Sequence, residues 1–284
     1  MSLLICFVPH DKVILSLDRT EWDRGTHQYN ILCIVASVGK MAIPLYFEML
    51  DNNSGNSNTE DRIQVLSHIV TVLGAQRIKV LTMDREFIGH HWLKWLKQQG
   101  IPFCVRVPKS HWVHTIEGLS QKAADILEGT QGQTLITDAV VDNVVVNVSI
   151  SRAKDGELLY LIGTIAASGL KQTYRKRWPV EVFFQATKGR GFNMEQTGLR
   201  DSVKLRKLFA VVSLAFAVCW AVGLEQSRQQ PVKRKKHGYP QYSVFRRGLN
   251  LVRQALKRKL EGWFDRVFDL IQQRRCRFEM KTIG

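Results

Sequence analysis

Apolar and polar positions in the first part of the chain predict a buried sheet. Residues 13–18 (VILSLD) and 78–84 (IKVLTMD) are almost continuously apolar, and each run ends in an aspartate. A strand covered on both faces requires such a run, so both segments predict strands in the parallel part of an α/β sheet. Residues 27–50 predict two more strands, joined as a hairpin through Gly39 and Lys40.

Helical spacing of apolar residues marks the segments between and after these strands. Residues 59–74 open with T-E-D-R, a plausible helix start, and residues 90–100 end their helical pattern at a glycine. Residues 102–107 (PFCVRV) predict a fifth strand. Two longer helices are predicted at 201–226 and 243–273.

The pattern changes between residues 110 and 165 to turns and alternating strands. Val144, Val146 and Val148 fall on one face of such a strand, and helical character returns near residue 170. We therefore predict an α/β fold with a β-rich insertion. The predicted domains are a first core part at 1–109, the insertion at 110–165, a helical second core part at 166–226 and a basic helical region at 227–284.

The chain is strongly basic. Its 284 residues carry a formal net charge of +16, and 45% are hydrophobic, which is ample for a buried core. Residues 231–284 hold 15 Lys or Arg against 4 Asp or Glu. Basic side chains gain affinity for phosphates by releasing condensed counterions, so nucleic acid and an anionic membrane both fit.

One apolar segment, residues 208–224, raises the question of a membrane span. It has 17 residues, at the short limit for a span of about 20 residues. Its charged upstream flank and its small residues favour a helix buried in a large core. A membrane protein stays the competing interpretation.

The five cysteines and the first twelve residues indicate the cellular compartment of the protein. The cysteines are far apart and form no C-x-x-C pair, so neither a disulfide framework nor a cysteine zinc site is indicated. The opening MSLLICFVPHDK has no positively charged leader and no small-residue cleavage site. A reducing cytoplasm is the predicted compartment.

Asp18 and Asp84 form the first part of a candidate catalytic site. In open α/β sheets, ligands collect outside the carboxyl ends of the strands, where the two acids can meet. Either aspartate alone is more often a turn or helix-cap residue. A third acid, Glu181, would complete an oxygen site suited to Mg²⁺ or Mn²⁺.

Glu181 lies in YRKRWPVEVFFQATK, residues 174–188. Seven residues, close to two helical turns, separate Glu181 from Lys188, which predicts one shared stripe. Proline is tolerated at a helix start, so we expect the regular helix to begin near Pro179, with Tyr174 and Arg177 leading into it. An amphipathic helix with its charges in water is the equally weighted alternative.

The spacing of Tyr174, Arg177, Glu181 and Lys188 resembles the Y-R-E-K motif of the insertion-sequence-four family of DDE transposases. The stretches LSLDRTEW, GNSNTEDR and LTMDREF also resemble the blocks around that family's two aspartates. The resemblance runs from about residue 13 to residue 200, in the family's order.

This resemblance implies an RNase H-like mixed sheet flanked by helices. It also implies cut-and-paste transposition, in which Asp18, Asp84 and Glu181 hold two Mg²⁺ or Mn²⁺ ions that clamp the scissile phosphate. Water would free a 3′ hydroxyl that then joins target DNA. Tyr174, Arg177 and Lys188 would hold the neighbouring phosphates. The implied partners are double-stranded DNA, as transposon ends and target, and a second copy of the chain in a synaptic complex.

One departure from the family leaves alternatives open. Family members usually carry an N-terminal domain that recognises the transposon ends, whereas Asp18 here is almost at the start. The chain is therefore expected to be a fragment, a truncated product or a protein whose end recognition lies elsewhere. An RNase H-like nuclease without strand transfer and an inactive basic DNA-binding remnant are the competing functions.

Overall fold

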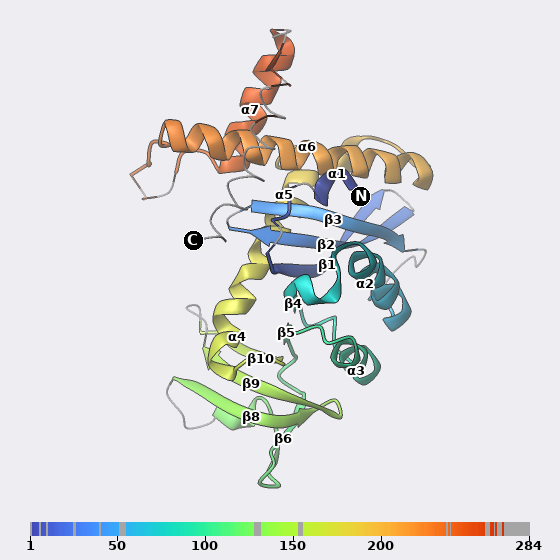
Figure 1. Cartoon of the computed structure of the whole chain (residues 1–284), viewed down its shortest axis with the longest axis vertical. Helices are drawn as coiled ribbons and strands as arrows, with labels where there is room; N and C mark the ends of the chain where they lie inside the picture. Colours follow the sequence, from blue (N-terminus) through green and yellow to red (C-terminus); the bar gives the residue numbers. More distant parts are fainter. Residues whose placement is uncertain are drawn as a thin grey trace.

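The computed structural model describes residues 2–269 apart from 6, 10, 25–26, 40, 51–54, 128–131, 153–155, 237, 239, 259–261, 264 and 266–268. Ten strands form one sheet in the order β3-β2-β1-β4-β5-β10-β9-β8-β6-β7 (Figure 1). The strands are β1 (Val13–Arg24), β2 (His27–Val38), β3 (Met41–Leu50), β4 (Ile78–Met83), β5 (Phe103–Arg106), β6 (Trp112–His114), β7 (Ser120–Lys122), β8 (Gln133–Val141), β9 (Val144–Arg152) and β10 (Leu158–Gly163).

Helices cover this sheet and extend beyond one end of it. The α-helices are α1 (Ser2–Ile5), α2 (Thr59–Leu73), α3 (His90–Gln98), α4 (Ala167–Tyr174), α5 (Trp178–Thr187), α6 (Ser202–Gln229) and α7 (Val244–Lys257). Short 3₁₀ turns are η1 (Ala75–Arg77), η2 (Asp125–Leu127), η3 (Arg175–Arg177) and η4 (Met194–Gln196).

The first five strands confirm the predicted RNase H-like class. β1, β2 and β3 pair antiparallel, whereas β1 pairs parallel with β4, and β4 pairs parallel with β5. Both faces of β1 are buried, since Leu15, Leu17 and Ser16 are all fully inaccessible. The continuous apolar runs in the sequence follow from this double coverage.

The prediction that the first strand ends at Asp18 is wrong. β1 continues to Arg24 because its antiparallel pairing with β2 extends that far. The parallel pairing with β4 ends earlier, at Leu17 and Met83. Asp18 therefore lies in the middle of a strand, whereas Asp84 directly follows one.

The strands from residues 110–165 continue the core sheet. β10 pairs antiparallel with β5, and β9, β8, β6 and β7 follow outward from it. Figure 1 shows this extension at the end of the molecule opposite α6. The division of the chain into four domains stays a prediction.

A helical rod made of α4, η3 and α5 crosses the sheet. α4 contacts β5, β9 and β10, η3 contacts β1 and β4, and α5 contacts β1, β2 and β3 (Figure 1). The prediction that a regular helix begins near Pro179, with Tyr174 and Arg177 leading into it, is confirmed, because α5 begins at Trp178. Tyr174 itself is the last residue of the preceding helix α4. Pro179 lies in the first turn of α5, and its missing N–H explains why the rod passes through a 3₁₀ turn just before it.

α6 packs on β3 and α5 at one end of the sheet. Phe209 of α6 lies within 5.7 Å of the ring centroids of Trp22, Phe47 and Phe183, which anchors α5 to the sheet. In the part of the chain that the structure describes, α6 alone is long and apolar enough to cross a membrane, and 56% of its most apolar window is buried against the protein. This packing agrees with the core-helix interpretation.

α7 crosses α6 at close range. A Cβ added to Gly248 would lie 1.7 Å from the carbonyl oxygen of Cys219, so glycine is required at the crossing. The prediction of a helix at 243–273 is confirmed as far as Lys257, and most of its remainder lies outside the described residues.

Candidate active site

Asp18 and Asp84 are neighbours on one face of the sheet. The parallel register pairs Ser16 with Thr82 and Leu17 with Met83, so the next positions are Asp18 and Asp84. Ser16 and Thr82 share a hydrogen bond of 2.9 Å on the same face. Side chains alternate along a strand and adjacent strands lie about 4.8 Å apart, so the carboxylates project side by side.

The helical rod brings Tyr174 and Arg177 onto this face. The Tyr174 hydroxyl donates to Asp84 Oδ1 at 3.1 Å. Arg177 Nη1 donates to Asp18 Oδ2 at 2.5 Å, and Nη2 lies 4.0 Å from Asp84 Oδ2. The guanidinium carbon also lies 5.6 Å from the centre of the Tyr174 ring.

Glu181 joins this group through the same guanidinium. Arg177 Nη2 donates to Glu181 Oε1 at 2.5 Å, across one helical turn. One arginine thus contacts or approaches the carboxylates of Asp18, Asp84 and Glu181. The Arg177 and Asp18 side chains are 11% and 14% exposed, whereas those of Asp84 and Glu181 are 32% and 30% exposed. The group therefore opens to solvent on the side of the latter two.

The buried position of this group changes its acid–base properties. Burial raises the pKa of Asp18 to about 6, with Asp84 and Glu86 adding to the rise and Arg177 and the Arg19 N–H opposing it. Burial and the neighbouring Asp84 raise the pKa of Tyr174, which keeps its hydroxyl protonated as a donor. Burial alone would lower the pKa of Arg177, but Asp18, Tyr174, Asp84 and Glu181 outweigh it and raise that pKa.

The comparisons with known proteins agree with this architecture. The family model described as a transposase DDE domain matches residues 9–218. The chain belongs to this family of DDE transposases. A comparison with curated proteins returned no match.

Solved structures similar to this chain include one transposase and two endonucleases. The piggyBac transposase synaptic complex with hairpin DNA has a TM-score of 0.41 at 13% identity, covering 92% of this chain. The chain spans 57% of the length of that structure. Human endonuclease V has a TM-score of 0.33 at 14% identity, with 69% of this chain and 85% of that chain covered. Bacillus subtilis endonuclease V has a TM-score of 0.32 at 9% identity, with 62% and 83% covered.

The chemistry of the donor set fits a hard divalent cation. Asp18, Asp84 and Glu181 supply carboxylate oxygens, the ligands that Mg²⁺ and Mn²⁺ prefer, and all three lie around the Arg177 guanidinium. Among the described residues, no group of three acidic, histidine or cysteine side chains is close enough to hold an ion directly. Instead, the guanidinium of Arg177 supplies the positive charge between the carboxylates.

Lys188 lies apart from this group. It caps the C-terminal end of α5, and its Nζ lies 3.9 Å from Glu195 Oε1. Its side chain is one-third exposed. The ion pair that the structure gives Lys188 is therefore with Glu195 rather than with one of the three carboxylates.

Arg106 is a site residue that the sequence alone did not reveal. The parallel register pairs Met83 with Val105, so the next positions are Asp84 and Arg106. Asp18, Asp84 and Arg106 thus form a row across β1, β4 and β5. The sequence did carry a signal for Arg106. The strand in PFCVRV ends at this charged residue, as the apolar runs before Asp18 and Asp84 end at charged residues.

Arg106 also lines a basic cleft beside the candidate site. The cleft has a volume of about 530 Å³, and its cations are Arg85, Arg106 and Lys109. Arg106 Nη2 donates to Glu157 Oε1 at 2.6 Å, so one carboxylate partly balances this charge. Because Arg85 directly follows Asp84, the cleft continues from the carboxylates toward the strands of residues 110–165.

Proposed function

We propose that this chain is a metal-dependent DNA transposase of the insertion-sequence-four type, which cleaves DNA strands and joins them to a target by cut-and-paste transposition. The observation that carries this proposal is the meeting of three remote acids, Asp18, Asp84 and Glu181, around one guanidinium. Their order and the spacing of Tyr174, Arg177, Glu181 and Lys188 match the Y-R-E-K pattern.

Asp18, Asp84 and Glu181 would hold the divalent ions. Two Mg²⁺ or Mn²⁺ ions, when bound, activate the attacking oxygen and stabilise the leaving oxygen of a phosphodiester. The three carboxylates have the oxygen donors for this role, and two of them are open to solvent, where DNA can reach them.

Arg177 and Tyr174 would hold the phosphate beside the cut. A guanidinium can grip two phosphate oxygens at once, and it can exchange carboxylate partners for phosphate partners without losing its charge. Tyr174 keeps its proton and therefore donates, either to Asp84 or to a phosphate oxygen. Lys188 would act further along the strand as a point charge.

The DNA path would follow the basic cleft. Arg85, Arg106 and Lys109 continue the positive surface from the site, and each phosphate neutralised there adds salt-dependent affinity. Double-stranded DNA, as transposon ends and as target, is the proposed substrate. Pairing of two ends would require a second copy of the chain in a synaptic complex.

A strand-transfer assay tests this proposal. Linear DNA with 3′ hydroxyls and randomised terminal sequences would be incubated with a supercoiled plasmid, the protein and Mn²⁺, and the joined products sequenced. The expected result is joining by the wild type and a loss of at least about 100-fold in Asp18→Asn, Asp84→Asn and Glu181→Gln, since metal contacts supply several kcal/mol of catalysis.

The controls separate the competing functions. Glu117→Gln removes an exposed carboxylate outside the site and should leave joining unchanged. Metal-dependent cleavage without joining would indicate an RNase H-like nuclease. DNA binding alone, unaffected by the three substitutions, would indicate an inactive DNA-binding remnant. Joining that persists in all three variants would overturn the proposed site.

A further inference from the structure

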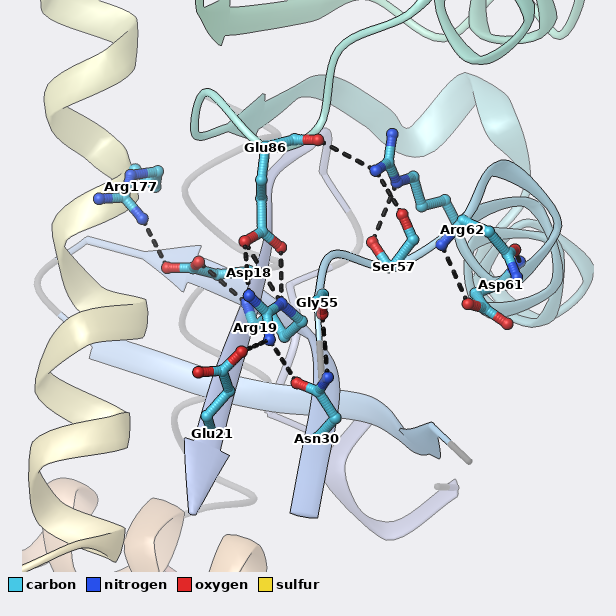
Figure 2. A network of polar contacts seen from close by, with 11 residues as sticks. Asp18, Arg19, Glu21, Asn30, Gly55, Ser57, Asp61, Arg62, Glu86 and Arg177 are labelled. Carbon is cyan, nitrogen blue, oxygen red and sulfur yellow. Dashed lines mark hydrogen bonds and ion pairs between the residues drawn. The ribbon is translucent and has the colours of Figure 1, made fainter. Parts of the chain in front are cut away.

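A second polar network lies directly behind the two aspartates. Arg19 follows Asp18 on β1, and its side chain contacts Glu86 (Figure 2). Glu86 lies two residues after Asp84 in the sequence. Arg19 Nε donates to Glu86 Oε1 at 3.0 Å and lies 3.3 Å from Oε2, and Nη2 donates to Oε2 at 3.1 Å. Both carboxylate oxygens of Glu86 are therefore engaged by one guanidinium.

The remaining face of Arg19 is also occupied. Its Nη1 contacts the carboxylate of Glu21 and lies 2.5 Å from Asn30 Oδ1. The Arg19 and Glu86 side chains are 10% and 20% exposed. These forked, charge-assisted hydrogen bonds fix the backbone at Arg19 relative to the backbone at Glu86. Breaking them is costly, because either side chain left alone would be a largely buried charge without a partner.

Arg62 of α2 holds the same loop from the other side. Its Nη2 donates to the Glu86 carbonyl at 3.0 Å, and its Nη1 donates to the Ile88 carbonyl at 3.1 Å. Its Nε donates to Ser57 Oγ at 3.0 Å (Figure 2). Asn30 in turn donates to the carbonyl of Gly55 at 3.1 Å. The residues after Asp84 are thus fixed to both β1 and α2.

Glu86 is not arranged as a metal ligand. Its two oxygens already accept from Arg19, and Arg19 points to the opposite side of β1 from Asp18 because neighbouring side chains alternate along a strand. The pair is linked to the site through the backbone: Arg19 N–H donates to Asp18 Oδ1 at 2.9 Å, and Arg85 N–H donates to Asp84 Oδ1 at 2.8 Å. The charge of Glu86 also helps to raise the pKa of Asp18.

We propose that Arg19 and Glu86 are positioning residues that set the separation between the carboxylates of Asp18 and Asp84, and thereby the affinity of the site for divalent ions. This inference rests on the proposed function, since it assumes that the two aspartates bind metal. The parallel pairing of β1 with β4 ends just before the two aspartates, at Leu17 and Met83. Beyond that point, the contact between Arg19 and Glu86 connects the segment that carries Asp18 to the segment that follows Asp84.

The test measures Mn²⁺ binding by calorimetry in the absence of DNA. Glu86→Gln keeps the shape of the side chain and removes its charge, and Arg19→Lys keeps the charge and removes the fork. Because partners behind metal ligands typically contribute 10- to 100-fold in affinity, each variant should raise the Mn²⁺ dissociation constant by at least about tenfold. Circular dichroism would verify that both variants are folded.

A matched control variant and a measurement at saturating Mn²⁺ distinguish a positioning role from a general loss of structure. Glu48→Gln breaks the ion pair of Glu48 with Arg206, which lies away from the site, and should change the Mn²⁺ dissociation constant by less than about twofold. In the joining assay, Glu86→Gln should need more Mn²⁺ for half-maximal rate yet recover most of the wild-type rate at saturation, as expected for a loss of metal affinity alone.

The outcomes distinguish the two proposals. If wild-type protein binds Mn²⁺, Asp18→Asn abolishes binding, and folded Glu86→Gln and Arg19→Lys bind as the wild type does, the positioning role is wrong and the proposed function stands. If wild-type protein binds no Mn²⁺, or Asp18→Asn binds it unchanged, both proposals fail.

Discussion

Arg177 and Asp18 lie 159 residues apart in the chain, and Arg177 Nη1 is 2.5 Å from Asp18 Oδ2. The same guanidinium contacts Glu181, so it occupies the space between two of the three acids. A divalent ion bound at the proposed site would compete with this guanidinium for the same oxygens. Metal binding and the release of Arg177 toward a phosphate should therefore be coupled.

The first prediction concerns this competition. Arg177→Gln removes the competing charge, so the metal-free site should bind Mn²⁺ about 5- to 10-fold more tightly, within the usual range of coupling between two ligands. The same variant should bind DNA more weakly, because a phosphate contact is lost. Calorimetry for Mn²⁺ and fluorescence anisotropy for DNA would measure the two effects.

Arg175→Gln is the matched control for Arg177. Arg175 carries the same charge on the same 3₁₀ turn but is exposed. This variant should leave the Mn²⁺ affinity unchanged. Equal Mn²⁺ affinities for Arg177→Gln and the wild type would show that the guanidinium does not compete with the ion.

The second prediction concerns the stability of the metal-free protein as pH changes. The folded-state pKa of Asp18 is raised from 3.8 to about 6, so the unfolded chain loses this proton more readily. The stabilising contribution of protonated Asp18 is present below about pH 4 and is lost as pH rises through about 6. In EDTA, the stability of Asp18→Asn relative to the wild type should therefore rise across this interval, by on the order of 3 kcal/mol.

Chemical denaturation at several pH values between 4 and 7 would measure this difference. Glu117→Gln, which removes an exposed carboxylate, should follow the wild-type curve. A constant difference between Asp18→Asn and the wild type across the interval would contradict the raised pKa. Mn²⁺ affinity of the wild type should rise over the same interval, since the ion binds the deprotonated carboxylate.

The third prediction concerns Arg62, which is 5% exposed and contacts two carbonyls of the loop after Asp84. Arg62→Ala leaves these carbonyls and the carbonyl of Ser57 without their donor, so the free energy of unfolding should fall by about 3 kcal/mol or more. Lys79→Ala removes an exposed cation at the start of β4 and should change stability by less than about 0.5 kcal/mol. Urea denaturation would measure both; similar values would refute a structural role for Arg62.

The fourth prediction concerns the basic cleft. Lys109→Ala and Arg85→Ala should each weaken DNA binding and reduce the slope of log affinity against log salt by about one. Glu157→Gln should strengthen binding, because it removes the carboxylate that balances Arg106. Anisotropy titrations from 50 to 200 mM salt would measure the slopes. Lys79→Ala, at the opposite end of β4 from Asp84, is the control, and equal slopes for all variants would exclude the cleft from the DNA path.

Much of the fold could be predicted from local patterns. The apolar runs before Asp18 and Asp84 predicted buried strands, and helical spacing located α2, α3 and α6. These predictions succeed because burial on one or two faces determines which residue types each position tolerates. The end of β1 was predicted wrongly, since strand length depends on how far a partner strand extends.

The candidate site, like the fold, could be predicted from the sequence only in part. The types and order of Asp18, Asp84 and Glu181 are properties of the sequence; they predicted an oxygen site for a divalent ion, and the resemblance to the DDE transposases added the prediction that it acts on phosphates. The row that includes Arg106, the bridge from Arg19 to Glu86 and the place of Arg177 between the acids were decided only by tertiary structure. Strand register and helix crossing join residues up to 159 positions apart, and no local periodicity encodes such distances.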